Sequence, residues 1–198
     1  MFGMYELEGI DDFTVQEIAE PEPKDIYESF EFKELEMIID IQTCIECNEN
    51  LKIDRWSELT LEERCDILQS LENDVAAIES RLPMFVMTQT LPFGQCGYAD
   101  CEKGVIVIAE SELADNSISG LREVVDTIIH EGRHAYQYQN VFMNRTEIND
   151  DKFQGWRDNY KYGYLSQEQF GYFAYRFQPL EADAWSFAEK TVSGLSFR

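Results

Sequence analysis

Histidine and positive charge are scarce in this chain. It has two histidines among 198 residues, and its 16 lysines and arginines face 39 aspartates and glutamates, so the formal net charge at pH 7 is −23. A surface of that charge repels nucleic-acid phosphates and anionic lipids. We therefore expect no nucleic-acid partner and no membrane partner. A basic protein partner fits the charge, although acidic residues in such numbers usually form a solvated surface.

Long apolar runs and an even set of cysteines are also missing. No stretch approaches the length that spans a bilayer, and residues 1–12 show neither the basic segment nor the apolar stretch of a signal peptide. Five cysteines make an odd number, which is not typical of a secreted disulfide framework. We expect a cytoplasmic protein. A structural zinc site made by Cys44, Cys47, Cys96 and Cys101 is an alternative, but the first pair falls in an expected helix rather than a knuckle.

The chain does have enough apolar sequence for a core, since 44% of its residues are hydrophobic. Spacing of the apolar residues predicts helices over about 31–50, 59–82 and 118–140, and a last helix that starts near residue 167 or after Pro179. We expect Thr60 to cap the second helix, and Ser117 or Ser119 the third. The apolar stripe of the first helix consists of Phe32, Leu35, Ile38, Ile39 and Ile45.

Between these helices the hydrophobic period changes to that of strands. Residues 84–90 and the apolar, β-branched run 105–110 predict two strands, and 95–100 is a candidate short or edge strand. The polar and aromatic region 141–165 is expected to be loop with a short helix. Helices beside a small sheet predict an α+β fold. We expect an acidic arm and helix at 1–50 and a domain at 51–198, or one continuous domain.

Both histidines lie in the motif HEGRH, four residues apart. On a helix, residues i and i+4 share a face, so His130 and His134 can reach one metal ion. Glu131 is turned about 100° around the helix from His130, where it can reach a water on that ion but not easily the ion itself. This is the arrangement of HExxH sites, in which two histidines bind Zn²⁺ and the glutamate is the general base. The alternative, two buried structural histidines, would need partners in an apolar helix.

A third metal ligand must be a carboxylate or a cysteine, because no histidine remains. Glu181 and Asp183 lie in an expected helix that starts at Pro179. Two residues apart, they point to nearly opposite sides, so one of them faces the metal. We choose Glu181 as the ligand, since small residues follow it at helical spacing, and we give Asp183 a supporting role. The alternative reading of Glu181 is an ordinary glutamate in a first helical turn.

The motif HEGRH with a later helix that carries a glutamate resembles the zincin metallopeptidases, in their gluzincin arrangement. Over roughly 83–190, the chain is similar to small zincin peptidases of bacteria and their mobile elements. It implies a zincin-like α+β fold with N-terminal helices and a small mixed sheet. An edge strand, 95–100 or 105–110, would lie over the active-site helix and pair with an extended peptide or protein substrate.

Two features of the sequence leave alternatives open. Zincins usually carry an uncharged residue where Arg133 stands, and this arginine pairs either with carboxylates of the chain or with a substrate. Zincins often use a tyrosine or histidine to stabilise the oxyanion, and the sequence does not single out one of seven nearby tyrosines. A zinc peptidase is the leading hypothesis. An acidic binding or inhibitory module with a degenerate or structural metal site, and a metal-dependent hydrolase of non-peptide bonds, are the alternatives.

Overall fold

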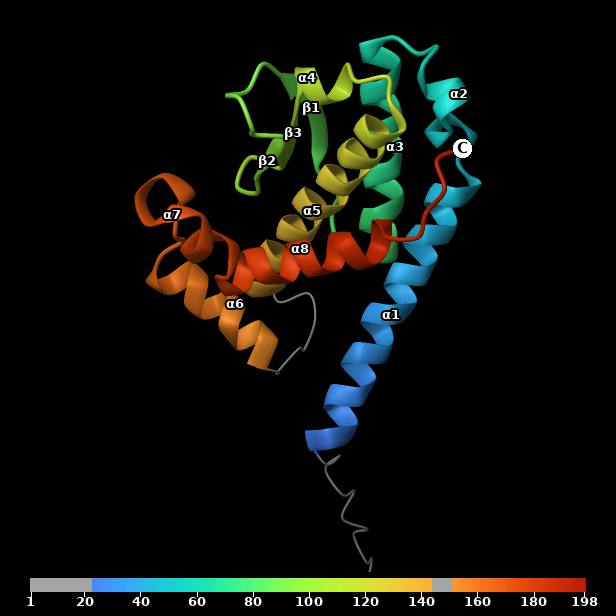
Figure 1. Cartoon of the computed structure of the whole chain (residues 1–198). Coiled ribbons are helices and arrows are strands. Elements are labelled where there is room, and N and C mark those ends of the chain that lie inside the picture. Colours follow the sequence, from blue (N-terminus) through green and yellow to red (C-terminus); the bar gives the residue numbers. More distant parts are fainter. Residues whose placement is uncertain (1–22, 144–150) are drawn as a thin grey trace, which may run out of the picture.

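The computed structural model describes residues 23–143 and 151–198. Within these ranges the chain is α+β, with eight α-helices, one short 3-10 helix and a three-stranded sheet (Figure 1). The elements are α1 (Pro23–Cys47), η1 (Glu49–Leu51), α2 (Ile53–Trp56), α3 (Leu61–Ile78), β1 (Phe85–Gln89), β2 (Gly97–Asp100), β3 (Val105–Ala109), α4 (Glu110–Leu113), α5 (Ile118–Met143), α6 (Asp151–Tyr162), α7 (Gln167–Arg176) and α8 (Pro179–Val192). None of the helices in these ranges is long and apolar enough to cross a bilayer.

The sheet is mixed and has the strand order β1-β3-β2. Strand β3 is central: it pairs in parallel with β1, where Phe85 faces Val105, and antiparallel with β2, where Gly97 faces Ile108. The apolar run therefore forms the buried middle strand, as its β-branched residues predict. This corrects one of our two candidates for the edge strand, because 105–110 has neighbours on both sides and 95–100 supplies the edge.

Helix α5 is the central helix of the molecule, and α8 crosses it (Figure 1). It begins where Ser117 was expected to cap it, since the Ser117 hydroxyl accepts a hydrogen bond from the Gly120 backbone N–H. Thr60 likewise caps α3 in a complete capping box with Glu63. The last expected helix is two helices, α7 and α8, one at each of the two starting points we considered.

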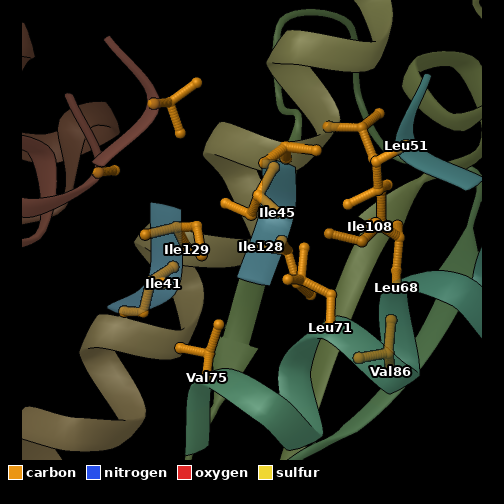
Figure 2. Close-up of a cluster of buried hydrophobic side chains, with 14 of the residues drawn as sticks. Ile41, Ile45, Leu51, Leu68, Leu71, Val75, Val86, Ile108, Ile128 and Ile129 are labelled. Carbon is orange, nitrogen blue, oxygen red and sulfur yellow. The ribbon is translucent and has the colours of Figure 1, made fainter. Parts of the chain in front are cut away.

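One core joins α1, α3, the sheet and α5, as Figure 2 shows for ten labelled side chains. Ile38, Ile41 and Ile45 bring α1 into this core. The predicted stripe of α1 was wrong at three positions, because Phe32, Leu35 and Ile39 are 61%, 52% and 51% exposed. Ile41 replaces them on the buried face, since one face of the helix packs on α3 and α8 and the opposite side stays in solvent. The division of the chain near residue 50 stays a prediction.

The described part of the region 141–165 is more helical than expected. Helix α6 runs for 12 residues where we predicted loop with a short helix. Only Trp156 and Asn159 are buried in it, and they lie three residues apart. Two buried side chains among polar residues are too few to show a helical period in the sequence, so packing on α8 decides the structure here.

Gly132, inside the HEGRH motif, lies against a buried ion pair. Arg81 and Glu72 form a bidentate salt bridge, with nitrogen–oxygen distances of 2.5 and 2.8 Å. A Cβ at Gly132 would come within 2.8 Å of the Arg81 Nη2 atom and 3.2 Å of Glu72 Oε2. The motif therefore needs a glycine here so that α5 can approach this pair.

We predict that Gly132→Ala destabilises the protein by about 1–3 kcal/mol, because the added methyl group overpacks the ion pair. Gly155→Ala in α6 is the matched control: its Cβ would meet Pro179 at 3.4 Å, an ordinary contact. That change should stabilise the protein by up to about 1 kcal/mol, since alanine favours the helix. Denaturant unfolding with a chelator present measures both, and equal stabilisation by the two changes would contradict the prediction.

Candidate metal centre

The two histidines of α5 turn their rings toward one point. His130 and His134 are one helical turn apart, and their Nε2 atoms lie 3.2 Å from each other. Their rings meet edge to face, and the other side of the His130 ring packs against the Trp185 indole of α8. His130 is buried and His134 is partly buried. The i, i+4 spacing therefore produces the shared face that the sequence predicts.

Glu181 of α8 joins this pair. It stands in the first turn of α8, which begins at Pro179, and is 1% exposed. Its Oε1 atom lies 3.2 Å from His134 Nε2, and its Oε2 atom lies 3.5 Å from His130 Nε2. In the part of the chain that the structure describes, these three residues are the one group of histidine, cysteine or acidic side chains with the spacing of metal ligands.

The distances and donor types of this cluster fit a small tetrahedral cation. Nitrogen and oxygen ligands about 2.0–2.1 Å from a tetrahedral Zn²⁺ lie about 3.3 Å from one another. The two Nε2 atoms lie 3.2 Å apart, and each of them lies 3.2 or 3.5 Å from a different oxygen of Glu181. Two imidazoles and one carboxylate are also a ligand set that zinc enzymes use. Glu181 Oε2 is buried and has no hydrogen-bond partner, so it has a free electron pair inside the cluster.

Glu181 and His134 shift each other's pKa. Burial by itself would raise the pKa of Glu181, but the contacts with His130 and His134 outweigh it and hold this pKa well below its usual range. Burial would lower the pKa of His134, and the contact with Glu181 instead raises it to about 9. The carboxylate thus holds positive charge at this point, as a protonated ring when no metal is bound.

Two tyrosines complete the surroundings of Glu181. The Tyr164 hydroxyl donates a hydrogen bond to Glu181 Oε1, and the Tyr175 hydroxyl of α7 lies close enough to Glu181 for its pKa to respond to this carboxylate. Burial and the nearby Glu181 carboxylate raise the pKa of both phenols, so both keep their protons. The sequence alone did not single out these two among seven tyrosines. Tyr164 reaches the site through the turn between α6 and α7, and Tyr175 reaches it through α7, and neither path can be read from local spacing.

Glu131 is 8% exposed and follows His130 on α5. Burial, and after it the Glu131 carboxylate, raise the pKa of the Cys101 thiol to about 12. The same carboxylate contributes to the raised pKa of Tyr175. The Glu131 carboxylate is therefore within electrostatic range of Cys101, which directly follows β2, and of Tyr175 in α7. Its side chain does not belong to the three-residue cluster, in agreement with the turn of about 100° between neighbours on a helix.

Arg133 points away from this cluster into a buried ionic network. It is 0% exposed. Its Nε atom lies 2.8 Å from Asp183, and its terminal nitrogens lie 2.9 Å from Glu34 and 3.5 Å from Glu79. Of our two interpretations of this arginine, the structure shows the pairing with the chain's own carboxylates. Lys152 also contacts both Asp183 and Glu34.

Gln137 is a residue of the site that the sequence reasoning missed. Its Oε1 atom is 2.9 Å from His134 Nδ1, and its Nε2 atom donates to Asp183. The signal in the sequence was its place three residues after His134, on the same face of α5. Asp183 reaches His134 through Gln137.

We predict that Arg133→Met destabilises the protein by about 3–5 kcal/mol, because it leaves buried carboxylates without their cation. Arg55→Met is the control: Arg55 pairs with Glu58 at the surface, where both side chains are more than half exposed. Removal of an exposed pair changes stability by less than about 1 kcal/mol. Denaturant unfolding at pH 7 checks both. An Arg133 effect no larger than that of Arg55 would contradict the network.

Asp183 should contribute to the free energy of unfolding at neutral pH, and acid should remove this contribution. Burial would raise its pKa, but Arg133 lowers it from 3.8 to about 2. A group with a lowered folded-state pKa stabilises the protein above the unfolded pKa, and this contribution is lost as the pH falls through the folded pKa. We therefore expect about 2 kcal/mol of stability to disappear between pH 4 and 2. Between pH 4 and 2, the free energy of unfolding of Asp183→Asn should therefore fall by about 2 kcal/mol less than that of the wild type, as measured from unfolding curves.

No protein-family model, no curated protein and no solved structure matches the chain. What the centre does must therefore be argued from its own geometry.

Proposed function

We propose that this chain is a zinc-dependent peptidase of the zincin type. His130, His134 and Glu181 hold the Zn²⁺, and Glu131 is the general base. The observation that carries the proposal is the convergence of two imidazole nitrogens and a buried carboxylate, whose ligand atoms all lie within 4.8 Å of one another. Three protein ligands leave a fourth place open, which distinguishes catalytic from structural zinc sites.

The residues around the ion have separate tasks in peptide hydrolysis. A zinc ion in such a site makes water more acidic and polarises a carbonyl group. Glu131 takes a proton from the attacking water and passes it to the leaving amine. Tyr164 and Tyr175 are protonated and lie next to Glu181, and a hydroxyl that donates to this carboxylate must leave it before it can donate to an oxyanion.

Strand β2 supplies an edge for an extended peptide. It is the outer strand of the sheet on the side of α5. A Cβ on Gly97 would come within 2.8 Å of the Thr127 methyl group, so β2 lies directly on α5 three residues before His130. A peptide that pairs with this edge would run beside the metal ligands. This supports cleavage of a peptide or protein over hydrolysis of a non-peptide bond.

The other edge of the sheet is occupied at its start. Gln69 of α3 donates to the Met84 carbonyl and accepts from the Val86 N–H, and the Cys65 thiol contacts the Val86 carbonyl. These side chains occupy backbone groups at the beginning of β1 that a further strand would need. This favours strand addition at β2, the edge that borders the candidate centre.

The acidic binding module is the rival function, and its support in the sequence was the acidic composition of the first 40 residues together with Arg133. The buried pairing of Arg133 with Asp183, Glu34 and Glu79 removes the arginine from that argument. The charge also agrees with a peptidase that attracts basic substrates.

Zinc content and one isosteric variant test the proposal. Purified protein should hold one zinc per chain by elemental analysis. Glu131→Gln should keep the zinc and lose about 10²–10⁴-fold of the hydrolysis of fluorescein-labelled casein, because the base is gone while the ligands stay. Glu181→Gln should weaken zinc binding instead.

Glu123→Gln is the matched control, since Glu123 is an exposed glutamate two turns earlier on α5. It should keep both zinc and activity. Protein that binds no zinc, or a Glu131→Gln variant as active as the wild type, would refute the peptidase and leave the acidic binding module.

A further inference from the structure

The second nitrogen of the His134 ring contacts a side chain whose orientation the structure determines. Gln137 Nε2 donates to the Leu180 carbonyl over 2.9 Å and to Asp183 Oδ2 over 2.8 Å. An amide nitrogen has two hydrogens and its carbonyl oxygen has none, and a backbone carbonyl and a carboxylate only accept. The reversed amide would place its oxygen against two acceptors. The Oε1 atom therefore faces His134 Nδ1, at 2.9 Å.

This orientation fixes the proton on the ring. Because Gln137 Oε1 can only accept a hydrogen bond, Nδ1 of His134 must carry a hydrogen. In a neutral ring, Nε2 then has the free electron pair. Nε2 is the nitrogen that lies 3.2 Å from both Glu181 Oε1 and His130 Nε2. The ring is thus held in the tautomer that a metal ligand in this cluster needs.

Asp183 cannot turn away from Gln137, because two cations hold it. Arg133 bonds to both of its oxygens, at 2.8 and 3.3 Å, and Lys152 lies 2.6 Å from Oδ1. Asp183 is 6% exposed and Gln137 is 0% exposed, so water does not compete for these bonds. A chain of buried hydrogen bonds therefore leads from Arg133 to the His134 ring.

We propose that Gln137 and Asp183 are positioning residues, which hold His134 as the Nδ1–H tautomer with Nε2 directed at the metal. This proposal rests on the proposed function, since it assigns the partners of one ligand of that centre. Partners of this kind orient the ligand ring and commonly contribute about 10–100-fold to metal affinity.

Gln137→Met tests the role, and Gln139→Met is its matched control. Both glutamines are buried on α5 and both bond to backbone groups, but Gln139 bonds to the N–H and carbonyl of Leu82, away from the cluster. Each variant loses buried hydrogen bonds and some stability. Zinc affinity, measured by competition with a chromophoric chelator, should fall about 10–100-fold in Gln137→Met and stay within about twofold of wild type in Gln139→Met.

Long-range ¹H–¹⁵N spectra of the imidazoles provide a second readout that needs no variant. The chain has two histidines, so two rings appear, and a His130→Gln sample assigns them. We expect His134 to be protonated at Nδ1 when zinc is bound, and also without zinc at a pH above the raised pKa of this ring, where the ring is neutral and has one hydrogen. A His134 ring protonated at Nε2 alone, or bound to zinc through Nδ1, would overturn the proposal.

The outcomes separate this proposal from the function on which it rests. If the wild type binds zinc and Gln137→Met binds it equally well, the positioning role is wrong and the peptidase stands. If the wild type binds no zinc, the peptidase fails, and the spectrum of the metal-free ring in its neutral form, above its raised pKa, still decides whether Gln137 fixes the tautomer.

Discussion

The crossing of α8 over α5 is the contact on which the candidate centre depends. HEGRH places two imidazoles on one face of α5, but two rings alone do not make a catalytic site. The crossing sets Glu181 beside them and Asp183, two residues later, beside Arg133. The same pair of helices therefore forms both the metal cluster and the ionic network that supports it. Small buried residues at the crossing, Ala184 and Ala188 among them, let the two helices approach closely.

The residues of the HEGRH motif lie on two sides of α5, one at the candidate site and one against buried ion pairs. His130, Glu131 and His134 belong to the site, while Gly132 and Arg133 face buried ion pairs. Buried ion pairs are costly to form, and an apolar replacement is often as stable. Here the network has a second effect, because it connects four helices: Glu34 comes from α1, Arg133 from α5, Lys152 from α6 and Asp183 from α8. We infer that it fixes the relation of these helices more than it adds to stability.

The sequence predicted those parts of the molecule that depend on local spacing. The HEGRH helix, the Thr60 cap and the buried strand 105–109 each follow from neighbouring residues, and each is found where it was expected. The prediction of Glu181 over Asp183 used helical geometry, and the structure brings Glu181 to the rings. What the sequence did not provide were contacts between distant residues: the pairing of Glu34 with Arg133, 99 positions apart, and the choice of Tyr164 and Tyr175 among many tyrosines. The stripe of α1 failed for the same reason, since its apolar residues lie all around the helix and tertiary packing selects the buried side.

The three side chains of the candidate centre are also held by contacts within the protein. Gln137 bonds to the His134 ring, Trp185 packs against the His130 ring, and Tyr164 bonds to the Glu181 carboxylate. In the proposed function, contacts of this kind order the ligands and leave more of the binding free energy for affinity. A proton competes with the metal in that function. Burial would lower the pKa of His134, but Glu181 raises it to about 9, so that at neutral pH the ring must release a proton before Nε2 can bind a cation. The carboxylate that would attract the metal thus also strengthens its competitor, and the proposed zinc affinity should rise with pH until the ring is neutral.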